Sequence, residues 1–314
     1  MRHKNKAIAA LMLVMIAVGC TKQDMPNNGS NNGGGNAQNI PMGALNGIFK
    51  VSDTKQVRFS KGNLQFKAST NTWRFAESQW SFVGGTYIHN SCGNVSIDGK
   101  KCSNDSISPN YNGWIDLFGW GTSGWNSGAV CYEPWSASIQ TNDYLVGGSS
   151  TNGLYGTYYH ADWGSNAITN GGNVTEKWRT LTHDEWLYLH QHNIMFRASV
   201  NGVNGLFILP AGFQIPEGMT HYNLDDENWH NNRYNLSGGQ RMEANGAVFL
   251  PITGCRIGDG FRGSTSGWYW SSTPSTNISG SVYSFEFTGE KIWPGGYCPM
   301  RQEGYAVRLV QDVL

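Results

Sequence analysis

The chain has 314 residues with 22 basic and 22 acidic side chains, so it lacks the basic excess that nucleic-acid-binding proteins carry. Only 14% of the residues are charged, whereas 41 are glycine and 13 are tryptophan. This composition argues against a disordered chain and against a helical bundle, and it favours a globular domain rich in strands and loops.

The N-terminal residues have the pattern of a secretory signal. Basic side chains within residues 2–6 precede an apolar run over residues 7–18, which is shorter than the ~20 residues that span a bilayer. Residues 17–20, Ala-Val-Gly-Cys, resemble the lipobox of bacterial lipoproteins, in which the cysteine is acylated and becomes the first mature residue. We therefore predict a signal peptide over residues 1–19 and lipidation of Cys20; the alternative is an ordinary cleaved signal.

The segment after Cys20 offers almost no apolar surface to bury. Residues 27–36 are only Asn, Gly and Ser, so residues 20–41 are predicted to form a lipidated, flexible tether. Residues 42–314 are predicted to form a single globular domain. Because more than one acyl chain holds a protein stably on a bilayer, we expect this domain at the bacterial outer membrane, on the cell surface or the periplasmic face.

The domain is predicted to begin with a small antiparallel meander. Apolar and polar residues alternate over residues 47–52, 55–60 and 64–68, which is the period of a half-buried strand. Residues 73–76 follow a Ser-Thr-Asn-Thr turn and are the fourth predicted strand. Residues 84–112 are polar and rich in Gly, Asn and Ser, so we predict an exposed insertion there.

One helix has a clear start signal. Thr182 and Glu185 form a capping box, in which each side chain satisfies a free amide at the helix start, and the predicted helix runs from His183 to about Gln191. Short apolar runs after this helix predict strands separated by long loops, at residues 205–210, 246–251, 267–273, 282–287 and 305–310.

Five cysteines remain once the lipidated one is set aside, and an exported protein can form disulfides. Cys92 and Cys102 flank a polar loop and are one predicted pair. Cys255 and Cys298 are the other predicted pair, which leaves Cys131 free. Spacing alone does not determine connectivity, so other pairings stay open.

Four motifs, in chain order, resemble one protein family. They are Trp178-Arg179-Thr180-Leu181-Thr182-x-x-Glu185-Trp186, Leu250-Pro251-x-x-Gly254-x-Arg256, Tyr269-Trp270-Ser271-Ser272-Thr273 and Gly304-Tyr305-x-Val307-Arg308-Leu309. Together they resemble a large set of paralogous bacterial lipoproteins with a C-type-lectin-like fold, in the branch shared with formylglycine-generating enzymes and phage tropism determinants. The resemblance covers about residues 44–314. It implies an α+β domain with short antiparallel strands, long loops and one or two helices, whose last strands and loops display ligands.

Catalytic and metal chemistry find little support in the residues. Formylglycine-generating enzymes use a pair of nearby cysteines close to the C-terminus, and here Cys298 stands alone in that region. His183 and His190 share a helix face, but they are not at the i,i+3 or i,i+4 spacing of helical zinc ligands. We predict no catalytic residue, no metal site and no cofactor. The alternative is calcium, for which Asp225 to Asn228 offer oxygen ligands.

Large aromatic residues gather in the C-terminal loops, over residues 256–268 and 289–301. Trp268, Trp293 and Tyr297, together with Arg262, are the predicted ligand-binding residues. Rings held in loops of a rigid scaffold are frequent binding residues, and they suit a glycan and a protein ligand alike.

The predicted function is a lipid-anchored ligand-binding or adhesion module without catalysis, which meets the membrane through its anchor and binds no nucleic acid. One alternative is an enzyme derived from the formylglycine-generating branch. Another is a subunit of a fimbria-like surface assembly.

Cys20→Ala tests the predicted anchor. Without a thiol to acylate, the chain should move from the membrane fraction to the soluble fraction or stay unprocessed, because lipid chains supply the attachment. Fractionation followed by mass spectrometry of the N-terminus measures both outcomes. Unchanged membrane attachment of the variant would contradict the prediction.

Overall fold

The two ends of the described chain meet in one antiparallel sheet. In this computed structural model, strand β2 pairs with β1 on one side and with the last strand, β20, on the other, with Val57 opposite Asp312. Strand β9, which precedes the first α-helix, completes the sheet through the pair Leu309 and Thr180. The order is β1 (Phe49–Lys50), β2 (Gln56–Phe59), β20 (Leu309–Asp312) and β9 (Arg179–Thr180).

The structure describes residues 40–84, 86–87, 90–91, 96–97, 100–101, 104–219, 222–224, 229–262, 265–295 and 299–313. The predicted signal, Cys20 and the tether up to residue 39 lie outside this range. From Ile40 onward the chain clusters as one unit. None of the helices described in these ranges has the length and the apolar character needed to cross a membrane.

The four predicted N-terminal strands are present, but the meander is wrong. Strands β3 (Leu64–Lys67) and β4 (Thr72–Phe75) form a separate two-stranded sheet, and β3 does not pair with β2. The reason is competition from the C-terminal segment. The Ser60 amide donates to the Leu309 carbonyl and the Leu64 amide donates to the Val307 carbonyl, both at 2.9 Å.

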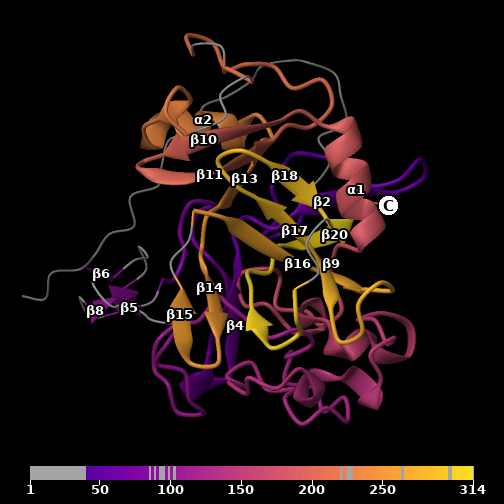
Figure 1. The fold of residues 1–314 in the computed structure, drawn as a ribbon. Helices are drawn as coiled ribbons and strands as arrows, with labels where there is room; N and C mark the ends of the chain where they lie inside the picture. The colour runs from indigo at the N-terminus through magenta and orange to yellow at the C-terminus, as the bar shows by residue number, and fades with distance from the viewer. Residues whose placement is uncertain are drawn as a thin grey trace, which may run out of the picture. The chain divides into compact units, whose positions relative to one another are not determined.

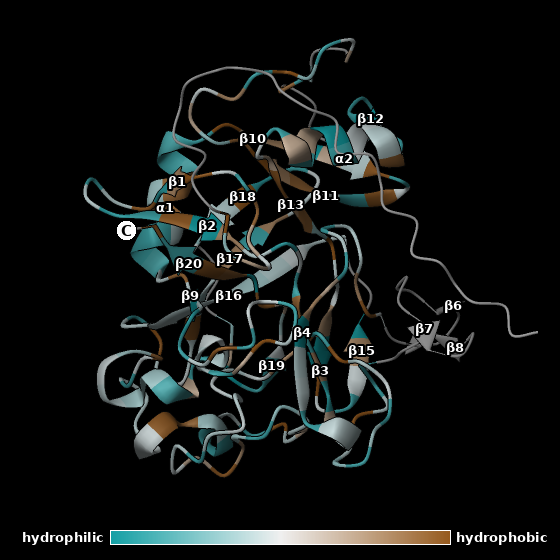
Figure 2. Cartoon of the chain, turned by 180° about the vertical axis from the view of Figure 1, so that it is seen from behind, coloured by the Kyte–Doolittle hydropathy of each residue, from teal (hydrophilic) through white to brown (hydrophobic). Residues whose placement is uncertain are grey.

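A second sheet lies under the second α-helix, α2 (Leu236–Ala244) (Figure 1). Asn201 and Gly202, both with positive φ, join β10 (Met195–Val200) to β11 (Val203–Ile208) in a tight hairpin turn. Its fourth strand is apolar throughout, as the brown colour in Figure 2 shows. The strand order is β12 (Arg233–Tyr234), β10 (Met195–Val200), β11 (Val203–Ile208) and β13 (Val248–Pro251).

Helix α1 (His183–His192) confirms the predicted start and length. The Glu185 amide donates to Thr182 Oγ1 at 3.2 Å, and the Thr182 amide donates to Glu185 Oε2 at 2.9 Å. Arg179 holds the same Glu185 carboxylate through both of its terminal nitrogens, at 2.7 and 2.8 Å. Trp186 and Leu189 point into the core, so the helix packs against the C-terminal strands (Figure 1).

Two three-stranded antiparallel sheets contain the strands from β14 to β19. The Ala306 amide donates to the Trp268 carbonyl at 3.2 Å and the Trp270 amide donates to the Ala306 carbonyl at 3.1 Å, so the sheets are linked through the main chain. The sheets are β15 (Gly260–Arg262), β14 (Cys255–Ile257) and β19 (Glu303–Gly304), and β16 (Gly267–Pro274), β17 (Val282–Phe287) and β18 (Ile292–Pro294).

The remaining elements are short. Two small hairpins lie within the predicted insertion, and 3-10 helices are scattered along the loops. They are the strands β5 (Thr86–Tyr87), β6 (Asn90–Ser91), β7 (Ser96–Ile97) and β8 (Lys100–Lys101), and the 3-10 helices η1 (Ala68–Thr70), η2 (Thr141–Tyr144), η3 (Val146–Gly148), η4 (Gly156–Ala161) and η5 (Trp163–Ser165). With two α-helices and several small antiparallel sheets among the described residues, the domain is mixed α and β.

A buried polar network joins distant parts of the chain around Arg308, just before β20. Its guanidinium donates to Gln79 Oε1 at 2.8 Å and to Asn63 Oδ1 at 3.3 Å. Gln79 Oε1 also accepts the Phe249 amide of β13 at 2.6 Å, and Gln79 Nε2 donates to Glu243 of α2 at 3.1 Å. Burial lowers the pKa of Arg308 to about 10, so this buried group stays charged at neutral pH.

Asn104 and Asp116 close the base of the predicted insertion. The Asn104 amide donates to the Gly84 carbonyl at 2.8 Å, and its Oδ1 accepts the amides of Asp116 and Leu117. Asp116 in turn accepts the Val83 amide at 2.7 Å and Asn104 Nδ2 at 2.9 Å. Both side chains are fully buried, so the insertion leaves and re-enters the domain at one fixed point.

Asp116→Asn tests the buried charge at this point. Burial raises the pKa of the Asp116 carboxyl to about 7, although its hydrogen bonds lower it. A carboxyl whose pKa is raised on folding contributes stability that is complete below pH ~4 and is lost as the pH rises through about 7. Asn stays neutral, so the stability of the variant relative to the original chain should increase between pH ~4 and about 7.

Urea unfolding at about pH 4, 6 and 8 measures this difference. A loss of about 1–3 kcal/mol that does not depend on pH is added to this pH-dependent change, because the Asn amide leaves one donor unsatisfied. If the difference between the two chains is independent of pH, or shifts against the variant as the pH rises, then the hydrogen bonds outweigh burial and the account of Asp116 is wrong.

Candidate functional site

The four motifs that carry the family resemblance meet in the interior. Tyr269 donates its hydroxyl to the Pro251 carbonyl at 2.7 Å, which links the third motif to the second. The Ser272 amide donates to the Leu181 carbonyl at 2.9 Å, which links the third motif to the first. The rings of Trp270 and Tyr305 stack at 4.5 Å, which adds the fourth. These residues therefore form the structural framework of the domain. A ligand site must be sought among side chains that lie on the surface of this framework.

Two of the predicted ligand-binding residues lie in one row across neighbouring strands. In the sheet β16-β17-β18, Trp268 is directly opposite Glu286, and Glu286 is directly opposite Trp293. Residues that are directly opposite in antiparallel strands point to the same face, with Cβ atoms about 4.5–5.5 Å apart. The sheet thus presents a carboxyl group between two indole rings, and we call these three residues the aromatic row.

Trp268 is the inner end of the aromatic row. Its ring stacks on Tyr305 at 5.5 Å with an interplanar angle of 16°, and Tyr305 also stacks on the buried Trp270. Trp268 is half-buried, so less of its ring is open to a ligand than at the exposed Trp293. The cause is the pairing of β16 with the segment at Ala306, which brings Tyr305 under the indole.

Trp293 is the outer end of the aromatic row, and its side chain is 38% exposed. The ammonium of Lys291 lies 5.2 Å from the centre of its ring, within the range of a cation–π contact. At an exposed site such a contact is worth only about 0.5–1 kcal/mol, so a ligand can displace the lysine from the ring face.

Two acidic residues, one within the aromatic row and one next to it, were not predicted from the sequence. Burial raises the pKa of Glu286, the Trp268 indole lowers it, and the charge of Glu303 raises it further. Burial also raises the pKa of Glu303, while the Tyr305 hydroxyl, which donates to it at 2.6 Å, and the charge of Arg262 lower it. The sequence signal for Glu286 was a lone carboxylate in the otherwise apolar end of a strand, Phe285-Glu286-Phe287.

Arg262 lies at the exposed end of β15, where its charge acts on Glu303, so the structure brings it near the aromatic row. Tyr297 and the proposed calcium ligands Asp225 to Asn228 lie outside the described residues. Arg256 and Arg301, which occur in the same loops, are fully buried. The Arg256 guanidinium binds the carbonyls of Leu117, Ser136 and Gly258, so its role is structural.

The cysteines differ from the predicted pairing. Cys255 is a free, buried thiol, so the disulfide predicted for it is absent, and Cys92, Cys102 and Cys298 lie outside the described residues. Cys255 belongs to the buried cluster that also contains Trp270 and Tyr305, and burial raises the pKa of its thiol to about 11. At neutral pH this thiol is protonated and therefore a poor nucleophile. Cys131 is free, as predicted, and buried.

Metal ligands do not gather in the described part of the chain, where no cluster of three or more His, Cys, Asp or Glu side chains could hold an ion. The ring of His183 stacks on Tyr283 at 3.9 Å, and burial lowers its pKa. A neutral imidazole packed on a tyrosine explains this histidine without a metal.

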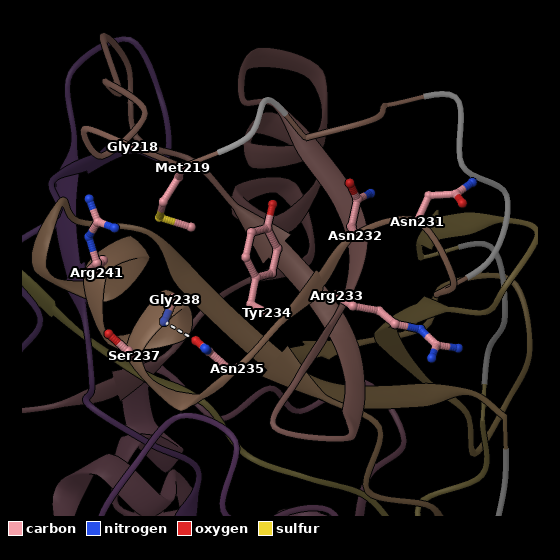
Figure 3. A pocket seen from close by; sticks show the side chains of 10 residues that line it. All are labelled: Gly218, Met219, Asn231, Asn232, Arg233, Tyr234, Asn235, Ser237, Gly238 and Arg241. Carbon is pink, nitrogen blue, oxygen red and sulfur yellow. Dashed lines mark hydrogen bonds between the residues drawn. The ribbon is translucent and has the colours of Figure 1, made fainter.

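A polar hollow of about 670 Å³ lies beside the start of α2 (Figure 3). Its polar groups are largely used within the protein. Asn232 binds both main-chain groups of Asn223, Asn235 caps α2 by accepting the Gly238 amide, and Arg241 donates to the Glu217 carbonyl. The hollow therefore offers fewer unmet polar groups than its size suggests, and it contains none of the predicted site residues.

Comparison with protein-family models, with curated proteins and with solved structures finds no match for this chain. The C-type-lectin-like resemblance therefore stays a prediction.

Trp268→Ala and Trp293→Ala separate the structural end of the aromatic row from its exposed end. Trp268→Ala should lower the free energy of unfolding by about 2–4 kcal/mol, because it removes a ring stacked in the core. Trp293→Ala should cost less than about 1 kcal/mol, because its ring is partly in solvent and touches an exposed lysine. Urea unfolding of both variants gives the two values. Equal losses would show that both rings are structural.

Proposed function

We propose that this chain is a lipid-anchored ligand-binding or adhesion module of the bacterial outer membrane, without catalysis, and that it binds through the aromatic row. The observation that carries the proposal is the register that places the buried carboxyl of Glu286 between Trp268 and the exposed Trp293. Apolar ring faces beside one convergent polar group are the composition of binding sites for glycans and for protein side chains.

Electrostatics supports recognition by contact rather than by long-range attraction. The chain has no formal net charge, and near the aromatic row the acidic Glu286 and Glu303 are matched by the basic Arg262 and Lys291. Ring stacking and hydrogen bonds then decide affinity, and salt should affect it little.

The interlocking of the four motifs supports a C-type-lectin-like domain as the scaffold. Their contacts join distant residues, such as Leu309 with Thr180 and Ser272 with Leu181, into one interior. A scaffold of this kind holds the strands β16 to β18 rigidly, so the aromatic row is presented in one geometry. The protonated, buried thiol of Cys255 does not favour the enzyme alternative, and no observation in the described ranges favours a fimbria-like assembly.

Glycan and protein arrays probed with the full-length chain test the proposed function. A ligand held by the aromatic row should bind about 5- to 150-fold more weakly to Trp293→Ala, which corresponds to the ~1–3 kcal/mol of an aromatic anchor. Trp125→Ala is the matched control, because Trp125 is also 38% exposed and its ring contacts His160, which is not part of the aromatic row. Its binding should equal that of the original chain.

Two outcomes would contradict the proposal. One is an array on which no bound ligand is weakened by Trp293→Ala. The other is an equal loss in the Trp125→Ala control, which would indicate nonspecific adhesion through exposed rings.

A further inference from the structure

A groove of about 360 Å³, separate from the aromatic row, lies where η4, the segment before β9 and the end of β20 meet. It contains none of the residues predicted from the sequence as ligand-binding. Two tyrosines on its edge have rings that are unusually open to solvent for such large side chains, 49% for Tyr155 and 41% for Tyr159. An exposed pair of rings beside a hollow is a feature that the fold itself does not require.

The floor of the groove has its polar groups satisfied within the protein. Arg179 is held between Glu185, at 2.7 and 2.8 Å, and Asp312, at 2.7 Å. Asp162 is buried and accepts hydrogen bonds from the Gly164 amide and from both the amide and the hydroxyl of Thr180. The floor therefore presents no unpaired charge, so an ionic ligand is not needed to complete it.

The edge of the groove is arranged around Tyr159. Its hydroxyl donates to the Glu176 carboxylate at 3.0 Å, and its ring packs on His160 with ring centres 3.9 Å apart. Glu176 has a backbone φ of 59°, in the left-handed region that residues other than glycine rarely adopt. Hydrogen bonds between the main-chain groups of Glu176 and Ser165 and of Asp162 and Tyr159 hold this geometry.

Charges of both signs surround the two rings. Glu176, Lys177 and Lys55 are among the residues that line the same groove. A hydroxyl group can donate to a carboxylate and accept from an ammonium, whereas an ion would be attracted by one and repelled by the other. A ligand with one apolar face and a rim of hydroxyls matches both the rings and this mixed edge.

We propose that this groove is a saccharide-binding site, in which Tyr155 and Tyr159 stack on the C–H face of a mono- or disaccharide and Glu176 accepts its hydroxyls. The volume is at the lower end of the ~300–1,000 Å³ of ligand pockets, which suits a small sugar rather than a long chain. The site goes beyond the proposed function, because it does not depend on the aromatic row.

Saturation-transfer NMR with the purified full-length chain tests the site. The probes are glucose, galactose, mannose, N-acetylglucosamine, lactose and maltose. Sorbitol, which has the hydroxyls without a rigid ring face, and the peptide Gly-Gly-Ala are the comparison compounds. At least one sugar should bind, with the strongest transfer to the C–H protons of one ring face, and sorbitol should give none.

Four variants locate the binding. Tyr155→Ala and Tyr159→Ala should each weaken the bound sugar about tenfold or more, as expected for loss of an aromatic anchor. Tyr159→Phe keeps the ring and should stay within about threefold. Gly153→Ala tests the role of the Tyr155 ring indirectly. Its backbone is not in the left-handed region, and its new Cβ would lie 2.3 Å from Tyr155 Cε1, so it displaces the ring without changing the tyrosine.

Trp293→Ala separates this site from the proposed function, because it should leave sugar binding unchanged. The proposal is overturned if no sugar of the panel binds, if Gly-Gly-Ala binds and the sugars do not, or if both Tyr→Ala variants retain full binding. Loss of sugar binding only in Trp293→Ala would assign the sugar to the aromatic row and would equally overturn the groove.

Discussion

The buried charge of Arg308 constrains the rest of the domain. Its guanidinium lies in the interior with Gln79 interposed between it and the carboxylate of Glu243, and the side-chain amides of Asn63 and Gln79 supply its hydrogen bonds. Asn63 precedes β3 and Gln79 follows β4, so the segments around β3, β4 and β20 must be assembled together before both terminal nitrogens find acceptors; the Nε of Arg308 is buried without one. Removing one partner of a buried charge costs more than an ordinary contact, because the desolvated group is left behind.

The framework residues lie in the interior of the C-terminal sheets, whereas the aromatic row extends to their edges. Tyr305 illustrates the division, since its ring supports Trp268 and its hydroxyl binds Glu303 at the edge of the aromatic row. A ligand that stacks on Trp293 would thus act on a strand whose neighbours are fixed in the core. Such support is what distinguishes a rigid binding residue from an exposed ring on a mobile loop.

Local signals in the sequence predicted several elements correctly. The capping box of Thr182 and Glu185 placed the start of α1. Alternation placed the short N-terminal strands and apolar runs placed β11, β13, β16, β17 and part of β20, whereas β10 was missed. Long-range pairing was not predictable from local patterns. For this reason the sequence did not indicate that β3 is hydrogen-bonded to the C-terminal segment instead of to β2. Helix α2 was missed because Gly238 and Gly239 disfavour a helix; Gly239 is there because a Cβ would lie 2.4 Å from Val200. The indoles of the candidate site were predictable from composition, whereas the place of Glu286 between them depends on register, which no local pattern contains.

Native-state hydrogen exchange at low denaturant tests most directly whether the Arg308 network makes the framework one cooperative unit. The amides of Leu64, Phe249 and Trp270 bond to Val307, Gln79 and Ala306, and so they join parts of the chain that the network connects. The account predicts that all three exchange only through global unfolding, with the same free energy and the same denaturant dependence. Separate free energies, with Leu64 exchanging through a local opening of the C-terminal segment while Phe249 stays protected, would contradict it.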